Sequence, residues 1–179
     1  MNKKILALLA GTMLATSVGY AAPVTELPEG QTNIGYDHYN LNHGFKDDNF
    51  YLEHALSPKY TLGLEQNDYS VNGFDARHTD ITVNYNLEKN VHLMVGDRSY
   101  SGDVDHSSKF LYGIGGTVNL APKLDGYASV AATNQSTDWQ TGLSYSLDGQ
   151  TALHLGYKSY KEDGSSTVDG IGFGINHKF

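Results

Sequence analysis

The sequence contains no cysteine, and after its first residues it contains no long apolar run. Without cysteine the chain cannot form disulfides, thiolate metal sites or a lipid anchor on a cysteine thiol. A membrane-spanning helix needs about 20 consecutive apolar residues, and no stretch beyond the start of the chain resembles one. These absences exclude a disulfide scaffold, a lipoprotein and a helical membrane protein.

Basic residues are also scarce. Lys and Arg number 12 against 20 Asp and Glu, and removal of Lys3 and Lys4 with a signal peptide would leave 10 against 20, a formal net charge of −10. Nucleic-acid affinity depends on Lys and Arg neutralising phosphates. We therefore expect no nucleic-acid partner.

The start of the chain has the pattern of a secretory signal peptide. Two lysines precede an apolar stretch from Ile5 to Ala10, and Gly19-Tyr-Ala21 fits an A-x-A-like cleavage site. A retained membrane anchor is the alternative, but the apolar stretch is too short to span. The expected organisation is a signal peptide at 1–21, a short periplasmic segment at 22–30 and one folded domain at 31–179.

Five strand-like endings recur along the chain, each with apolar residues at every second position. The last is Phe173, Ile175, His177 and Phe179, with small or polar residues between them. The endings lie 31, 33, 27 and 32 residues apart, which is the length of one long hairpin with its connections. Alternation with period two indicates strands with one apolar and one polar face. The other four endings are Phe50–Leu56, Ile81–Leu87, Ile114–Leu120 and Thr141–Leu147.

Short turns follow four of these endings, and longer polar connections follow the outgoing strands. Ten antiparallel strands result, or eight if the first hairpin is irregular. The first strand is expected around Asn33 to Leu41, with the faces of Tyr36 and His38 left open. The predicted turns are closed by the pairs Leu56–Tyr60, Leu87–Val91, Leu120–Leu124 and Leu147–Thr151. The predicted longer connections are 42–49, 68–78, 99–109, 134–138 and 161–167.

The strand pattern predicts an all-β, transmembrane, antiparallel up-and-down β-barrel with short periplasmic turns and longer extracellular loops. Closure follows because unpaired edge groups find no water in lipid. With Phe179 at the end, the chain resembles the small, porin-like outer-membrane β-barrel proteins of Gram-negative-type envelopes. The resemblance implies contact with outer-membrane lipid. It also implies that the barrel-assembly machinery reads the last strand through Gly174 and Phe179, with His177 a departure from the usual apolar residue.

Counting outward from the turns predicts which polar residues share the inner wall. The count places Asp80 opposite Arg98, and Ser144 beside His154. Acids and bases are nearly balanced, so either an ion-pair network fills the barrel or the same side chains line an open pore. The candidate lumen-lining residues are Glu53, Glu65, Asp80, His92, Arg98, Asp125, Tyr127, His154, Lys158 and Lys178.

This pattern favours a small porin-like channel for water, ions or small solutes, with no cofactor, no metal and no catalytic step. The main alternative is a non-conducting barrel that binds or adheres through its loops or braces the envelope. A membrane-embedded hydrolase is a remote alternative, because Ser144 and His154 could act as nucleophile and base, but the G-x-S-x-G motif is absent. A protease would draw on Asp97, Asp103, Asp105 and His106 at the outer rim. A calcium site would draw on Asp103 and Asp105, or on Asp47 and Asp48.

Overall fold

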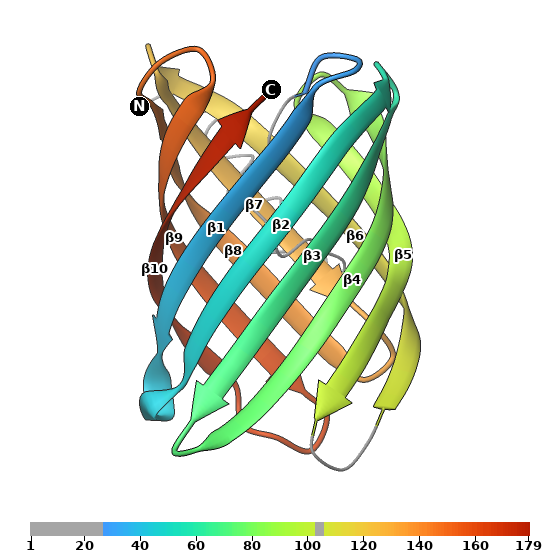
Figure 1. Ribbon diagram of the computed structural model, residues 1–179, viewed down its shortest axis with the longest axis vertical. Helices are drawn as coiled ribbons and strands as arrows, with labels where there is room; N and C mark the ends of the chain where they lie inside the picture. Colours follow the sequence, from blue (N-terminus) through green and yellow to red (C-terminus); the bar gives the residue numbers. More distant parts are fainter. Residues whose placement is uncertain (1–26, 103–105) are drawn as a thin grey trace, which may run out of the picture.

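The computed structural model describes residues 27–102 and 106–179, which form one closed sheet of ten antiparallel strands. Each strand pairs with its neighbours in chain order, and the first pairs with the last (Figure 1). A short 3-10 turn, η1 (Asn42–Gly44), joins the first two strands. Within the described ranges, no helix is long and apolar enough to cross a membrane. The strands are β1 (Thr32–Leu41), β2 (Lys46–Ser57), β3 (Tyr60–Val71), β4 (Phe74–Glu88), β5 (Val91–Gly102), β6 (His106–Ala121), β7 (Leu124–Ala132), β8 (Ser136–Ser146), β9 (Thr151–Glu162) and β10 (Val168–Lys178).

This architecture confirms the predicted up-and-down barrel and decides for ten strands over eight. The first hairpin is regular, because β1 and β2 pair continuously from Thr32 opposite His54 to Asn40 opposite Lys46. The β1–β10 pairing removes the edge that a flat sheet would present. The predicted signal peptide at 1–21, and most of the predicted segment at 22–30, lie outside the described residues.

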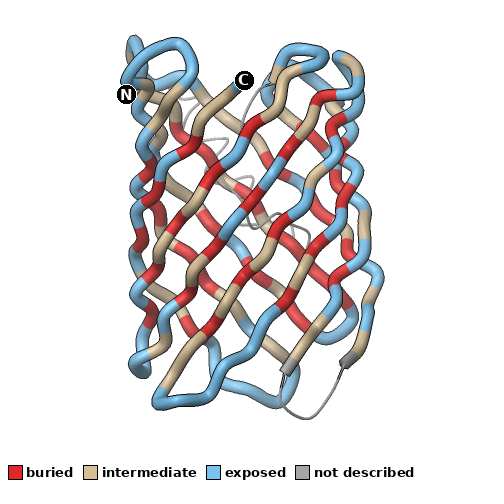
Figure 2. The backbone as a smooth tube through the Cα atoms, viewed as in Figure 1, coloured by how far each residue is buried: buried red, intermediate tan, exposed pale blue. Residues whose placement is uncertain are grey.

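Burial alternates along the strands in the sense expected of a barrel with lipid outside it (Figure 2). Large apolar side chains face outward, where Phe50 is 52% and Ile171 is 63% exposed. Polar side chains face inward, where Asn49 and Asn67 are fully buried. A water-soluble sheet would bury the first set instead. The outer wall is therefore suited to acyl chains and the inner wall to polar contacts.

Three of the four short turns are tighter than predicted. Ser57 pairs with Tyr60, which leaves Pro58 and Lys59 as the turn, and a β-bulge follows in β2. The predicted closing pair of Leu56 with Tyr60 is therefore wrong, because hairpins favour two-residue turns. The bulge takes up the extra residue, so the inward pairs beyond it keep the predicted register. The same correction applies to Leu87–Val91 and Leu120–Leu124, where Glu88 pairs with Val91 and Ala121 with Leu124.

The fourth short turn follows the prediction. The Leu147 amide donates to the Thr151 carbonyl oxygen at 2.9 Å across the intervening residues. Inside this turn, Asp148 Oδ1 accepts hydrogen bonds from the backbone amides of Gln150 at 2.7 Å and Thr151 at 2.6 Å. These backbone donors hold the pKa of the Asp148 carboxyl below its ordinary value.

At the opposite end, the connections are shorter than predicted. The expected loop 68–78 is a tight hairpin, because β3 runs to Val71 and β4 begins at Phe74. Asn72 and Gly73 make the turn with φ values of 48° and 84°. Asn-Gly is the sequence preference of such turns. Strands likewise extend into the predicted connections 42–49, 99–109, 134–138 and 161–167.

The first strand now has defined faces. Asp37 and Tyr39 point inward and are buried, so Tyr36 and His38 point outward. On the outer wall, His38 Nδ1 lies 2.8 Å from Asp48 Oδ1, and the Tyr36 hydroxyl donates to the same carboxylate. The barrel wall beside β1 therefore carries a polar cluster toward the end away from the termini.

Candidate functional site

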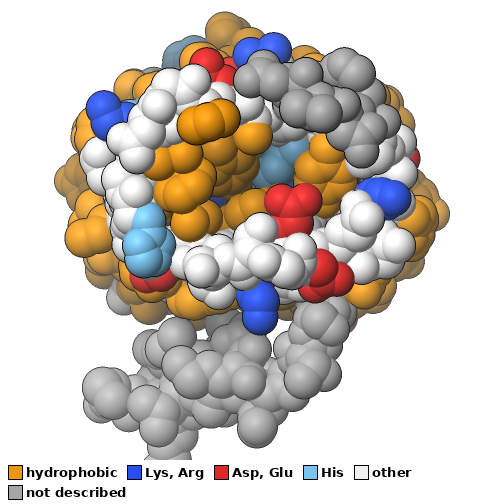
Figure 3. Space-filling model, turned by 90° about the horizontal axis from the view of Figure 1, so that it is seen from below, with side chains coloured by type: hydrophobic (Ala, Val, Ile, Leu, Met, Phe, Trp, Pro, Cys, Tyr) orange, Lys and Arg blue, Asp and Glu red, His pale blue; other side chains and the backbone are white. Residues whose placement is uncertain are grey.

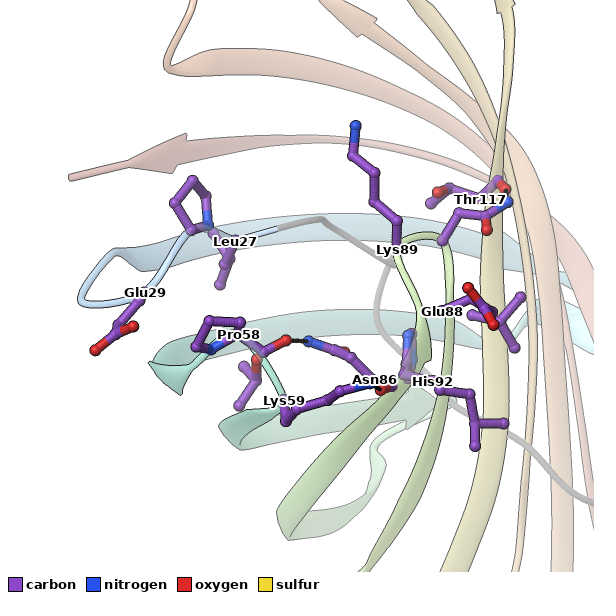
Figure 4. A pocket seen from close by; sticks show the side chains of 14 residues that line it. Leu27, Glu29, Pro58, Lys59, Asn86, Glu88, Lys89, His92 and Thr117 are labelled. Atoms are coloured by element: carbon purple, nitrogen blue, oxygen red, sulfur yellow. Dashed lines mark hydrogen bonds between the residues drawn. The ribbon is translucent and has the colours of Figure 1, made fainter.

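The barrel opens at its short-turn end into a cavity of about 400 Å³, called the vestibule below (Figure 4). The segment before β1, the β2–β3 and β4–β5 turns and β6 all contribute to its wall. Asn86 Nδ2 donates to the Pro58 carbonyl oxygen at 3.0 Å and so connects the two turns. The vestibule gives solvent access to the inner wall from this end. Its lining includes Leu27, Glu29, Lys59, Lys89, His92 and Thr117.

Beyond the vestibule, apolar side chains from several strands meet inside the barrel. Met94 occupies the inward position of β5 that follows His92. It clusters with Tyr51 from β2, Leu111 from β6, and Tyr127 and Ala131 from β7, all buried. We call these five residues the apolar cluster. It narrows the lumen next to the vestibule.

Farther along, the Arg98 guanidinium spans the lumen between two carboxylates. Its Nε and Nη2 atoms donate to both oxygens of Asp80, at 2.8 and 2.6 Å, on the neighbouring strand β4. Its Nη1 atom donates to Asp138 Oδ2 at 2.5 Å, on β8. Arg98 is fully buried. A planar guanidinium suits this arrangement because one edge binds a carboxylate with two parallel bonds while another donor remains free.

A second cation, Lys158 on β9, bridges the lumen in another direction. Its Nζ atom donates to Asp47 Oδ2 at 2.6 Å on β2 and to Asn67 Oδ1 on β3. The rings of Tyr39 and Tyr69 lie 5.4 and 5.5 Å from the same ammonium, within cation–π range. The five charged residues Asp47, Asp80, Arg98, Asp138 and Lys158 are called the ion-pair network below.

Aromatic rings cover the network on the side away from the vestibule. Tyr69 stacks on Tyr160 with ring centroids 5.2 Å apart, and His78 lies 5.4 Å from Tyr69 and 5.7 Å from Tyr160. Figure 3 looks into this end, where the surface is hollowed and apolar and histidine side chains line the hollow. Together the rings, the network and the apolar cluster place buried side chains inside the lumen between its two mouths.

The predicted pairing of Asp80 with Arg98 inside the barrel is confirmed. Eight of the ten lumen candidates are buried, whereas Asp125 and Lys178 are partly exposed near the short turns. Asp125 accepts a hydrogen bond from Asn119 Nδ2 at 2.9 Å. Any role of these residues in transport stays a prediction. The eight buried candidates are Glu53, Glu65, Asp80, His92, Arg98, Tyr127, His154 and Lys158.

Sequence reasoning missed two acids of the network. Asp47 and Asp138 fell within the predicted connections 42–49 and 134–138, whereas both lie on strands and face inward. The two-residue alternation of inward and outward positions could have identified both acids. Counting back two residues from the inward Asn49 on β2 gives Asp47, and counting back two from the inward Gln140 on β8 gives Asp138.

The residues considered for catalysis or metal binding make other contacts. His154 Nε2 lies 2.8 Å from Asn176 Oδ1. Asp97 accepts hydrogen bonds from Ser99 and Ser108. Asp103 and Asp105 lie outside the described residues, and the described part of the chain contains no group of three or more acidic or histidine side chains placed to hold a metal ion.

The last strand completes the barrel. The Phe179 amide donates to the Thr32 carbonyl oxygen at 2.8 Å, and the Thr32 amide donates back at 3.3 Å. Gly174 lies opposite Asp37, whose Oδ1 would stand only 1.8 Å from a Cβ at position 174. Position 174 therefore has room only for glycine, because the Asp37 side chain lies over it at the junction of β1 and β10. Recognition of this strand by the assembly machinery stays a prediction.

No protein-family model and no curated protein matches the sequence. Solved structures do match. The KdgM porin, solved in complex with disordered oligogalacturonate, has a TM-score of 0.50 and 8% identity over 82% of this chain and 99% of its own. The N-terminal β-barrel domain of Pseudomonas aeruginosa OprF has a TM-score of 0.46 and 11% identity over 86% and 100%. Ail, the attachment invasion locus protein of Yersinia pestis, has a TM-score of 0.38 and 13% identity over 84% and 99%.

At such low identity the likeness concerns the fold alone. The likeness to the KdgM porin agrees with the β-barrel fold that the sequence predicts. In its fold, this chain is a closed antiparallel β-barrel similar to that of the KdgM porin.

Proposed function

We propose that this protein is a small outer-membrane channel, closed at rest, that passes water, ions or small solutes when its ion-pair network rearranges. The observation that carries the proposal is the full burial of Arg98 and Lys158, each bridging the lumen to a carboxylate on a non-neighbouring strand. The proposal contains no catalytic step. Insertion would use the last strand as the assembly signal, through Gly174 and Phe179.

The buried charged residues favour a channel that opens when its ion pairs rearrange over a barrel whose interior is packed only for stability. Apolar side chains of similar volume stabilise an interior as well as a buried ion pair does, and often better, because desolvation offsets the attraction. A barrel that only needed to be filled could extend its apolar cluster. Charged groups held across the lumen can exchange protein partners for water when the lumen hydrates, and apolar groups cannot.

Planar-bilayer conductance tests the proposal directly. The double variant Asp47→Ala/Lys158→Ala removes one bridge without changing the net charge of the interior, so we expect larger or more frequent current steps than in the wild type. The matched control is Asp68→Ala/Arg77→Ala, because this ion pair lies on the outer wall. The control should conduct like the wild type. The proposal fails if the Lys158 double variant and an Arg98→Ala/Asp80→Ala/Asp138→Ala variant both pass no current.

The second candidate is a non-conducting barrel that braces the envelope. The apolar cluster and the ring stack over the network favour it, because both block the lumen independently of the ion pairs. Binding through long loops has less support, since the β3–β4 connection is only the turn at Asn72 and Gly73. Silence of both network variants in the bilayer would favour this candidate.

A further inference from the structure

The buried interior carries more acids than bases. Among the described residues, six carboxylates are buried and only two cationic side chains, Arg98 and Lys158, are buried with them. Uncompensated charge away from water is unfavourable, so an interior of this composition attracts positive charge from outside. The six acids are Asp37, Asp47, Glu53, Glu65, Asp80 and Asp138.

Three of these acids have one carboxylate oxygen that accepts no hydrogen bond from the described residues. Among the residues that the structure describes, Asp47 Oδ1 and Asp138 Oδ1 have no hydrogen-bond partner, because Lys158 and Arg98 bind only the other oxygen of each. Asp37 Oδ2 also has none. All three side chains are nearly or fully buried. Each is therefore an inward acceptor that receives no hydrogen bond from the described residues.

Asp37 stands on the vestibule side of this group. It precedes Tyr39 by one inward position on β1, and Tyr39 lies opposite Asp47. Asn49, the residue opposite Asp37, has its own Oδ1 without a hydrogen-bond partner among the described residues. A positive ion that moved inward from the vestibule would meet Asp37 before it reached the Asp47–Lys158 bridge.

We propose that the solutes of this channel are small monovalent cations, selected by the spare carboxylate oxygens of Asp37, Asp47 and Asp138. This inference rests on the proposed channel function. Acidic rings select cations in channel lumens because they lower the electrostatic energy of a cation and raise that of an anion. Selection in passing fits better than a fixed site, since these acids form no metal-binding group in the described part of the chain.

The test is the reversal potential in a KCl gradient across a planar bilayer. It is measured for the wild type and in the Asp47→Ala/Lys158→Ala background. We expect potassium to be preferred over chloride. Asp37→Asn keeps the shape of the side chain and removes its charge, so it should lower the potassium-to-chloride permeability ratio roughly twofold or more. Asp169→Asn is the matched control, because Asp169 lies on the outer wall, where Tyr157 donates to it.

The outcomes separate the two proposals. A current with no cation preference, or one whose ratio is unchanged by Asp37→Asn, overturns the selectivity and leaves the channel standing. A ratio that falls equally in Asp169→Asn also overturns it, since the effect would then come from surface charge. No current in any variant overturns the channel and the selectivity together. Circular dichroism and gel mobility of the Asp37→Asn protein confirm that it has folded.

Discussion

The Arg98 guanidinium is fully buried between two carboxylates and also donates to Ser136 Oγ at 3.4 Å. Asp80 binds it from the adjacent strand and Asp138 from across the barrel. The favourable term is a set of charge-assisted hydrogen bonds, and the unfavourable term is the desolvation of three charged groups. The balance changes sharply when one partner is removed, because the others stay buried without compensation.

Arg98→Met should therefore lower the free energy of unfolding by about 3–5 kcal/mol. Arg98→Met combined with Asp80→Asn and Asp138→Asn should recover a large part of that loss, because none of the three side chains is then a buried charge without its partner. Urea unfolding in lipid vesicles measures both, with the single tryptophan, Trp139, as the fluorescent reporter. An Arg98→Met protein as stable as the wild type would contradict this account of the network.

Asp148 shows the effect of a single charge at a turn. Its pKa is lowered by the backbone amides of Gln150 and Thr151, so its contribution to turn stability is complete above the ordinary Asp pKa of about 3.9. The contribution disappears as the pH falls through the lower folded-state value. Amide exchange at Gln150 and Thr151 should therefore accelerate in acid relative to neighbouring strand amides. Asp148→Ala should exchange fast at every pH, and a persistent acid-dependent step in that variant would refute the assignment.

At the scale of the elements, β4 and β5 approach so closely that one inward position accepts only glycine. A Cβ at Gly96 would lie 2.1 Å from the carbonyl oxygen of Ile81, which is backbone and cannot move aside. Gly96→Ala should therefore cost about 1–3 kcal/mol in the free energy of unfolding. Gly149→Ala is the control, since nothing lies within 4 Å of that position. Equal stability of the two variants in urea titrations would mean that the strands are farther apart than described.

Strand positions were predictable because outward apolar residues mark them. The Asp80–Arg98 pair was found although the turn between its strands was assigned one residue too long. The bulge between Asn86 and Glu88 cancels that error. Where the outward residues become polar, the signal ends although the strand continues. Beyond Phe50 the outward residues of β2 are Asp48 and Lys46, so the inward Asp47 between them looked like part of a loop.

The contacts between side chains of non-neighbouring strands inside the lumen could not be predicted from the sequence. Pairing between neighbouring strands follows from counting, but contacts such as Lys158 with Asp47 depend on barrel width and strand tilt. The alternation showed which residues face inward. It did not show which of them meet across the barrel, and therefore left a filled and an open interior equally consistent with the pattern.

At the scale of the whole molecule, the barrel has two unlike ends. The start of β1, the end of β10 and the four short turns lie at one end, and the hairpin at Asn72 and Gly73 lies at the other (Figure 1). An epitope inserted between Asn72 and Gly73 should be reached by antibody on intact cells, because this end faces outward in the proposed orientation. The same epitope after Lys123 should be reached only after the envelope is opened. The reverse pattern would invert the orientation.

Backbone hydrogen bonds join Thr32, the first residue of β1, to Phe179, which follows β10. The barrel cannot close until β10 has been synthesised, so a product that lacks β10 would keep two unpaired edge strands that are free to pair with other molecules. The same adjacency makes the starting point of the chain arbitrary. A circularly permuted variant that begins at Lys123, with a linker joining the original ends, should fold into the same barrel.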